Sequence, residues 1–291
     1  MKTLIASLVL ALTVSAKPAP AQTCKTCSND STPAQTAILV HGRGDTPARW
    51  DSLVSYFTAT GRGYVENTNL FRIDLAAYCG SNGFCSVLPG YSATYVNESY
   101  AKCLQAFINE KVPCTTTCPA VDIITHSQGG VMARYYTRFL APTQSPPREV
   151  NDFVVMANPI GNGITNCTLA GSCTGVNPED CPDSTFARKL NGVSPEGDGS
   201  NDETPSASQP NGPINYGSVV SSGDKTVVPW CTAYFIQNPQ TQQGDDLSCS
   251  RSGNYSLDGD ADQCKLSNVM HLVIPTNSTA IQHAYCTMNE D

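Results

Sequence analysis

The stretch Val121-Asp122-Ile123-Ile124-Thr125-His126-Ser127-Gln128-Gly129-Gly130 is an apolar run that breaks into a small, polar turn. The apolar residues from Ala120 to Thr125 predict a buried strand, and Gly129–Leu140 is predicted as the helix behind it. A strand that turns sharply into a helix exposes the residue at the turn, which here is Ser127. This stretch therefore predicts one strand–turn–helix unit of an α/β sheet with a serine at its turn.

The same alternation of strand and helix runs along most of the chain. Short apolar segments predict strands at 37–40, 70–73, 153–156 and 216–220, with a last strand ending near Val269. Helices are predicted from Thr46 up to Gly61, over the segment whose one face carries Tyr100 to Ile108, and over 276–288. Alternation at this spacing is typical of a mostly parallel sheet with helices on both faces.

Residues 157–213 interrupt this pattern because they are rich in Gly, Asn, Pro, Ser and Asp and have scarcely any apolar periodicity. A loop excursion of this length is unusual unless it is functional, so it is either a lid or substrate wall, or an inert surface insertion. No internal repeat and no second core are apparent, which predicts one domain over 22–291.

The turn at Ser127 has the spacing of the Gly-x-Ser-x-Gly motif, in which a serine is exposed to substrate and to an imidazole base. Thr125 replaces the first glycine, whereas Gly129 is retained. The alternative is a serine in an ordinary turn at a helix start. Other elements of the same machinery elsewhere in the chain favour Ser127 as a nucleophile.

A serine nucleophile requires backbone N–H groups that meet the negative charge of the tetrahedral intermediate. One donor is predicted at Gln128, directly after the serine, where the helix N-terminus adds its dipole. The second is predicted at Arg43, in the turn His41-Gly42-Arg43-Gly44 that follows the first strand. The alternative for that segment is a simple glycine turn.

The segment Ile38-Leu39-Val40-His41-Gly42 and the Thr-His-Ser-Gln-Gly turn resemble small secreted lipases and esterases of the lipase class 2 family. The resemblance covers most of the mature chain but is specific only at these two motifs. It implies an α/β-hydrolase fold, a lipid or other water-poor ester as substrate, an acid after a late strand and a histidine near the end of the chain.

Asp224 matches the place of the acid because it follows an apolar strand that breaks at Ser221-Ser222-Gly223. The alternative is an aspartate in a surface turn. The chain contains four histidines, of which His41 and His126 occupy the two turns already described. His271 is predicted as the base because it precedes the last helix, whereas His283 lies inside that helix.

Residues 1–21 have a positive start, an apolar stretch and small residues, which predict a secretory signal peptide cleaved after Ala16 or, as we prefer, after Ala21. The alternative is a membrane anchor, but the stretch is shorter than the ~20 residues that span a bilayer. Loss of Lys2 and Lys17 moves the formal charge from −8 to −10. An acidic surface argues against a nucleic-acid partner.

The chain contains 14 cysteines, and secretion would carry them into an oxidising compartment where disulfides form. Close spacings, such as Cys79/Cys85 and Cys167/Cys173, predict small stapled loops. Structural zinc is the alternative, but pairs such as Cys24/Cys27 have no second matching pair with histidines. We therefore expect no metal.

The sequence predicts a secreted, extracellular and monomeric serine hydrolase that acts on carboxylic esters, without a cofactor and without stable membrane insertion. A depolymerase of polyesters or cutin, or a serine peptidase or acyltransferase, would use the same catalytic groups. The non-enzyme alternative is a secreted binding module that has lost catalysis.

Overall fold

The computed structural model describes residues 24–27, 35–81, 96–158, 185–190, 214–227 and 262–289. The predicted signal peptide, the Cys167/Cys173 pair and most of the 157–213 excursion lie outside the described residues.

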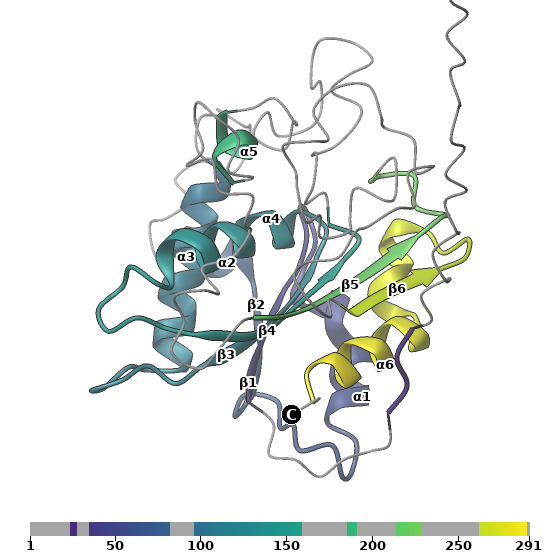
Figure 1. Cartoon of the computed structure of the whole chain (residues 1–291), viewed down its shortest axis with the longest axis horizontal. Coiled ribbons are helices and arrows are strands. Elements are labelled where there is room, and N and C mark those ends of the chain that lie inside the picture. The colour runs from purple at the N-terminus through teal and green to yellow at the C-terminus, as the bar shows by residue number, and fades with distance from the viewer. Residues whose placement is uncertain are drawn as a thin grey trace, which may run out of the picture.

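Six parallel strands form the central sheet in the order β2-β1-β3-β4-β5-β6 (Figure 1). Their bounds are β1 Thr36–Val40, β2 Leu70–Ile73, β3 Val121–His126, β4 Val150–Met156, β5 Asn215–Ser221 and β6 Asp262–Leu266. The predicted strands at 37–40, 70–73, 153–156 and 216–220 are thus confirmed to within a few residues. The register aligns the carboxyl ends, since Val40 pairs with Thr125, His126 with Met156, and Met156 with Val219.

The prediction that the last strand ends near Val269 is wrong. β6 ends at Leu266, which pairs with Ser221, the last residue of β5. The backbone N–H of Val269 instead donates to the hydroxyl oxygen of Ser221 (2.9 Å). The apolar character of Val269 therefore reflects packing of a turn and not a strand.

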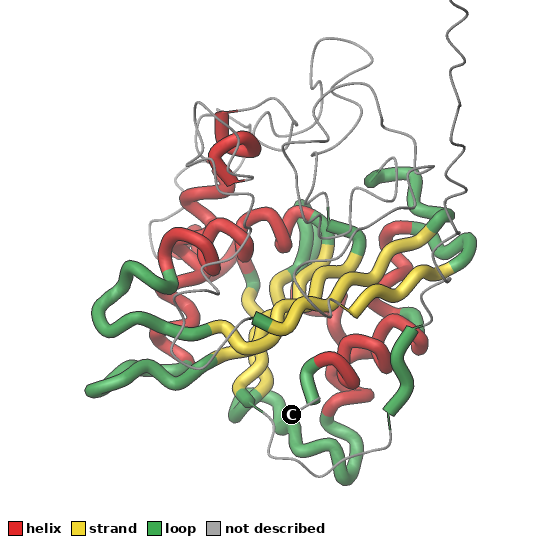
Figure 2. Tube along the Cα trace, in the orientation of Figure 1, coloured by secondary structure: helices red, strands yellow, loops and turns green. Residues whose placement is uncertain are grey.

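Both faces of the sheet are buried, as expected for parallel strands covered by helices (Figure 2). Side chains alternate between the faces along each strand, so Ile38 and Val40 belong to one core, and Ala37 and Leu39 to the other. This alternation explains why the strands read as continuous apolar runs.

One core packs beneath the helices at the right of Figure 1, which come from the two ends of the chain. They are the 3₁₀ turn η1 Pro47–Trp50, α1 Asp51–Phe57, the 3₁₀ turn η8 His271–Thr276 and α6 Ser278–Thr287. The predicted last helix over 276–288 is therefore one residue shorter at its end and begins two residues later. Its start is fixed by Asn277, whose side chain accepts from the N–H groups of Thr279 and Ala280.

The opposite core packs beneath the helices at the left of Figure 1. They are α2 Leu75–Ser81, α3 Val96–Lys111, α4 Gln128–Tyr135 and a π-helical turn η2 Tyr136–Leu140 that continues α4. The prediction that Cys79 lies in a loop is wrong, because Cys79 belongs to α2. The side chain of Asp74 accepts a hydrogen bond from the N–H of Ala77 (2.9 Å), in the first turn of α2. The segment has no apolar periodicity from which a helix could be predicted.

The predicted excursion includes one short described helix, α5 Thr185–Leu190. Phe186 stacks on Tyr135 at a centroid distance of 5.4 Å. Arg134 and Arg138 both donate to the carbonyl oxygen of Leu190 (3.4 and 3.0 Å), so the helix end is held against α4 and η2. This part of the excursion belongs to the core.

Among the described residues, no helix has the length and apolar character needed to cross a membrane.

Four disulfides join described residues: Cys24–Cys264, Cys27–Cys286, Cys79–Cys103 and Cys114–Cys118. The first two tie residues 24–27 to β6 and α6 across more than 200 positions of sequence. The third joins α2 to α3, so the predicted Cys79/Cys85 staple is wrong. Spacing along the chain gave the wrong partner for Cys79 because Cys103 lies on a neighbouring helix.

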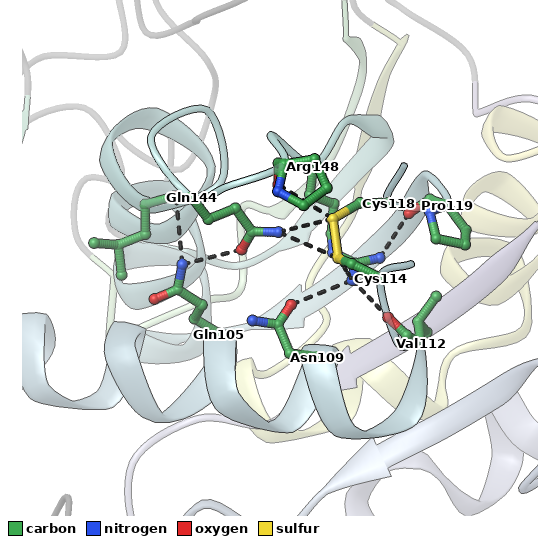
Figure 3. Close-up of a disulfide and its surroundings, with 10 residues drawn as sticks. Gln105, Asn109, Val112, Cys114, Cys118, Pro119, Gln144 and Arg148 are labelled. Carbon is green, nitrogen blue, oxygen red and sulfur yellow. Dashed lines mark hydrogen bonds between the residues drawn. A yellow bond between two sulfur atoms is a disulfide. The ribbon is translucent and has the colours of Figure 1, made fainter. Parts of the chain in front are cut away.

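The Cys114–Cys118 loop rests on a buried arginine (Figure 3). Arg148 donates to the carbonyl oxygens of Val112 (2.5 Å) and Pro119 (2.6 Å), and its Nη2 lies 3.0 Å from Cys114 Sγ. One guanidinium thus satisfies backbone acceptors on both sides of the loop between α3 and β3.

Removing the α2–α3 bridge in the double variant Cys79→Ala/Cys103→Ala should lower the free energy of unfolding by about 2–5 kcal/mol, because the unfolded chain gains freedom. Chemical denaturation of the variant and the wild type measures this loss. A non-reducing digest of the wild type should yield a linked Cys79–Cys103 peptide, and a Cys79–Cys85 peptide would contradict the pairing.

Candidate active site

Ser127 lies between β3 and α4 in a backbone conformation that few non-glycine residues adopt, with φ 53° and ψ −134°. Such conformations cost about 1–3 kcal/mol and persist where the surroundings impose them. Here the N–H of Ser127 donates to the carbonyl oxygen of Met156 (3.0 Å), and its own carbonyl accepts from Gly130 (3.1 Å). The turn is therefore held by β4 on one side and by the first turn of α4 on the other.

Two glycines allow the serine turn and the turn after β1 to lie in contact. A Cβ on Gly42 would lie 2.7 Å from Ser127 Cβ. A Cβ on Gly129 would lie 2.5 Å from the carbonyl oxygen of Val40 and 2.6 Å from that of His41. Neither position has room for a larger side chain. The glycines of both motifs thus permit the same close contact, between the serine turn and the turn after β1.

The structure explains why a threonine stands at the first position of the motif. Thr125 is fully buried, and its hydroxyl oxygen accepts from Nδ2 of Asn158 (2.5 Å). The hydroxyl also donates to the carbonyl oxygen of Val154 (3.3 Å). Thr125 therefore ties the end of β3 to β4, a role that glycine does not offer.

The three residues predicted as nucleophile, acid and base come together at the carboxyl edge of the sheet. His271 Nε2 lies 2.9 Å from Ser127 Oγ, and His271 Nδ1 lies 2.8 Å from Asp224 Oδ2. A carboxylate only accepts, so Nδ1 carries the proton and Nε2 faces the serine hydroxyl as an acceptor. Asp224 and His271 are buried, and the side chain of Ser127 is half-buried.

Backbone groups hold the carboxylate of Asp224 in place. Its Oδ1 accepts from the N–H groups of Thr226 (2.8 Å) and Val227 (3.0 Å), which leaves Oδ2 for His271. Ser221 joins this turn to the histidine turn, because its hydroxyl oxygen accepts from both Gly223 (3.1 Å) and Val269 (2.9 Å).

A second histidine, His126, packs against His271 with ring centroids 4.7 Å apart. Burial, and then the neighbouring His271, lower the pKa of His126 from 6.5 to about 3. The ring of His126 is therefore neutral at neutral pH. Burial also lowers the pKa of His41, whose ring lies between the carbonyl of Gly42 and the N–H of Leu75.

The two predicted oxyanion donors, Gln128 and Arg43, come directly after Ser127 and Gly42 along the chain. Gln128 is the first residue of α4, and its side chain donates to Oδ1 of buried Asn97 on α3 (3.0 Å). Arg43 follows Gly42, the residue in contact with Ser127.

His283, the alternative base, lies on α6 on one face of the sheet and is completely buried. Its Nδ1 accepts from the backbone N–H of Lys25 (3.0 Å), in the segment that the disulfides attach to β6 and α6. The structure thus places His271, and not His283, beside Ser127.

Among the described residues, no group of three or more His, Cys, Asp or Glu side chains is arranged to hold a metal ion.

Sequence reasoning missed three side chains around the site: His126, Ser221 and Arg49. Arg49 on η1 donates to the carbonyl oxygen of Leu272 (2.8 Å) and pairs with Asp45 (2.5 Å). The doubled serine before Gly223 was a signal for the turn at Ser221. For His126 and Arg49 the sequence carried no comparable signal, because their partners lie more than 140 positions away.

A mostly parallel sheet covered on both faces, with a serine at a sharp strand-to-helix turn, is the α/β-hydrolase architecture. No family model and no curated protein matches the chain.

Several solved structures resemble the fold. One is a membrane phospholipase A described as a bacterial virulence factor, with 15% identity over 89% of this chain and 80% of that one and a TM-score of 0.48. Another is the lin2722 gene product of Listeria innocua, with 12% identity, coverage of 89% and 95%, and a TM-score of 0.47. Carboxyl esterase 2 of the fungus Tuber melanosporum has 14% identity, coverage of 88% and 78%, and a TM-score of 0.42. Likeness at this level says nothing about the reaction of this chain.

The buried neutral His126 should make the protein less stable in acid. Its pKa is about 3 when folded and 6.5 when free, so the unfolded chain binds a proton that the folded protein does not. The free energy of unfolding should therefore fall as pH drops from 6.5 towards 3, by about 1.4 kcal/mol per pH unit for this one proton. Denaturation curves at pH 7, 6, 5 and 4 should show that slope reduced by this amount in His126→Phe. Equal slopes in the two proteins would contradict the assignment.

Proposed function

We propose that this chain is a secreted carboxylic ester hydrolase of the lipase and esterase kind, which works through an acyl-enzyme on Ser127. One observation carries the proposal. The imidazole of His271 bridges the hydroxyl of Ser127 (2.9 Å) and the carboxylate of Asp224 (2.8 Å), in the order that nucleophilic catalysis by serine requires.

In the first half of the proposed reaction, Ser127 Oγ attacks the ester carbonyl carbon while His271 Nε2 accepts the hydroxyl proton. Asp224 remains ionised and stabilises the imidazolium through its bond to Nδ1–H. The backbone N–H groups of Arg43 and Gln128 are the proposed donors to the negative oxygen of the tetrahedral intermediate. The carbon–oxygen bond to the alcohol then breaks, and His271 returns its proton to the departing alcohol.

In the second half, a water molecule replaces the alcohol. His271 removes a proton from the water as it attacks the acyl carbon, and a second tetrahedral intermediate forms at the same donors. The bond between the acyl carbon and Ser127 Oγ breaks, the acid leaves, and the serine recovers its proton. Every proton moves through His271, so the proposed cycle needs no cofactor.

Exposed apolar side chains beside His271 favour a water-poor ester over a peptide as substrate. Large apolar side chains are exposed at four described positions, and three of them flank the histidine: Met270, Leu272 and Val273. Such a group of side chains suits contact with acyl chains or a lipid surface. Secretion is supported by the leader-like residues 1–21 and by four disulfides within the described part of the chain.

A substrate panel tests the proposal and separates it from its alternatives. Nitrophenyl esters of increasing acyl length, a long-chain triglyceride, a polyester and casein should give ester hydrolysis with no digestion of casein. A fluorophosphonate should label the wild type covalently. Absence of both labelling and hydrolysis would favour a binding module, and cleavage of casein alone would favour a peptidase.

The variant Ser127→Ala should lose ester hydrolysis by at least about 10⁴-fold, because no other group forms the acyl-enzyme. Its melting temperature should match or exceed that of the wild type, since the hydroxyl adds little packing. Ser55→Ala, which changes an exposed serine on α1, is the matched control and should retain full turnover and labelling. Turnover by pure Ser127→Ala near that of the wild type would rule out the mechanism.

The two late histidines provide a direct comparison. His271→Ala should lower turnover by about 10³-fold or more, because it removes the general base. His283→Ala should change turnover by less than about tenfold, although its burial makes some loss of stability expected. Both rates should be measured well below the melting temperature of each variant. A larger loss in His283→Ala would contradict the assignment of the base.

A further inference from the structure

His126 makes contacts with His271 that the proposed reaction does not use. Its ring is buried and tilted by 40° against the ring of His271. Its Nε2 lies 3.2 Å from the backbone carbonyl oxygen of His271. His126 directly precedes Ser127, so one side chain of the serine turn touches both the ring and the main chain of the histidine.

The partners of His126 define its tautomer. A carbonyl oxygen only accepts, so Nε2 carries the proton and Nδ1 does not. Among the described residues, Nδ1 has no hydrogen-bond partner. Three titratable or charged groups act on the ring: His271 and Arg49 lower the pKa of His126, and Asp45 raises it. Burial is the largest of these effects and keeps the ring neutral, so the ring adds no repulsion when His271 becomes charged.

The turn that carries His271 has little packing on its outer side. Met270 and Leu272, on either side of the histidine, are 66% and 56% exposed. The main chain is instead held by two hydrogen bonds, a buried one from His126 to the carbonyl of His271 and an exposed one from Arg49 to the carbonyl of Leu272 (2.8 Å). These two side chains come from the serine turn and from the η1 turn that follows Arg43.

We propose that His126 is a positioning residue for His271. The Nε2–H group of His126 donates to the backbone carbonyl of His271 and so holds in place the turn that carries His271. This inference rests on the proposed function. A general base must keep its reacting nitrogen aligned with the serine hydroxyl, and a displacement of about 1 Å can cost about 10²-fold in rate. The hydrogen bond fixes the turn relative to Ser127 itself, because donor and nucleophile are consecutive residues.

Three variants separate the hydrogen bond from the ring. His126→Phe keeps a ring and removes the donor, and it should lower kcat by about 10- to 100-fold with KM changed by less than about twofold. His126→Gln lacks the ring but can place an amide donor where Nε2 lies, and it should recover kcat to within about threefold of the wild type. His126→Ala lacks both and should be at least as impaired as His126→Phe.

Fluorophosphonate inactivation gives a second readout that does not depend on the choice of substrate. Its rate should fall in His126→Phe by about the same factor as kcat, because Ser127 requires the same base for both reactions. His283→Phe and His283→Gln are matched controls, since they alter another fully buried histidine, which lies on α6 and accepts from the backbone N–H of Lys25. They should retain kcat and the labelling rate within about threefold.

Two results would overturn the inference while leaving the proposed function intact. One is a wild-type kcat in His126→Phe. The other is a loss of kcat in His126→Phe and His126→Gln that simply follows their melting temperatures. An unreactive wild-type protein would instead overturn the proposed function and this inference with it.

Histidine NMR on the wild type tests the contact even if the variants do not fold. Long-range ¹H–¹⁵N spectra should show the His126 ring as the neutral Nε2–H tautomer from pH 5 to 8, with a slowly exchanging proton. An Nδ1–H tautomer would contradict the hydrogen bond, because Nε2 would then have no proton to donate. Protonation of His126 near pH 6.5 would contradict the neutral state of the buried ring.

Discussion

The site depends on the turn at Ser127, where the chain leaves β3 with a positive φ and enters α4. That conformation is unfavourable for a serine by itself, so its surroundings must hold it in place. The carbonyl of Met156 binds the serine N–H, and Gly42 and Gly129 let the turn after β1 lie against it. Any side chain at either glycine would separate the two turns and displace the serine.

Burial of polar groups next to this turn sets its chemistry. Two backbone N–H groups and His271 satisfy the oxygens of the buried Asp224 side chain. His126 is also buried, and burial lowers its pKa so that its ring stays neutral. The imidazole of His271 thus lies between a hydrogen-bonded carboxylate and a neutral ring.

The sheet brings these groups together because the carboxyl ends of parallel strands share one edge. β3 supplies Ser127, the turn after β5 supplies Asp224, and the turn after β6 supplies His271. Ser221 joins the turn that carries Asp224 to the turn that carries His271. The disulfide Cys24–Cys264 ties β6 to residues near the start of the described chain. Local geometry at the edge therefore relies on connections between distant parts of the sequence.

The sequence alone determined the parallel α/β sheet and the residues brought together at its edge, because apolar runs and turn residues act over short distances. The bounds of β2 and the choice of Ser127 followed from such local patterns, whereas Asp224 and His271 were chosen with the help of the resemblance to secreted lipases. Only the tertiary structure decided that Cys79 pairs with Cys103 and not with Cys85, that Val269 belongs to a turn, and that α2 and α5 are helical. The contacts of His126 and Arg49 with the histidine turn likewise join residues more than 140 positions apart. A pattern in sequence reports which face of an element is apolar, whereas these outcomes depend on which elements the folded sheet makes neighbours.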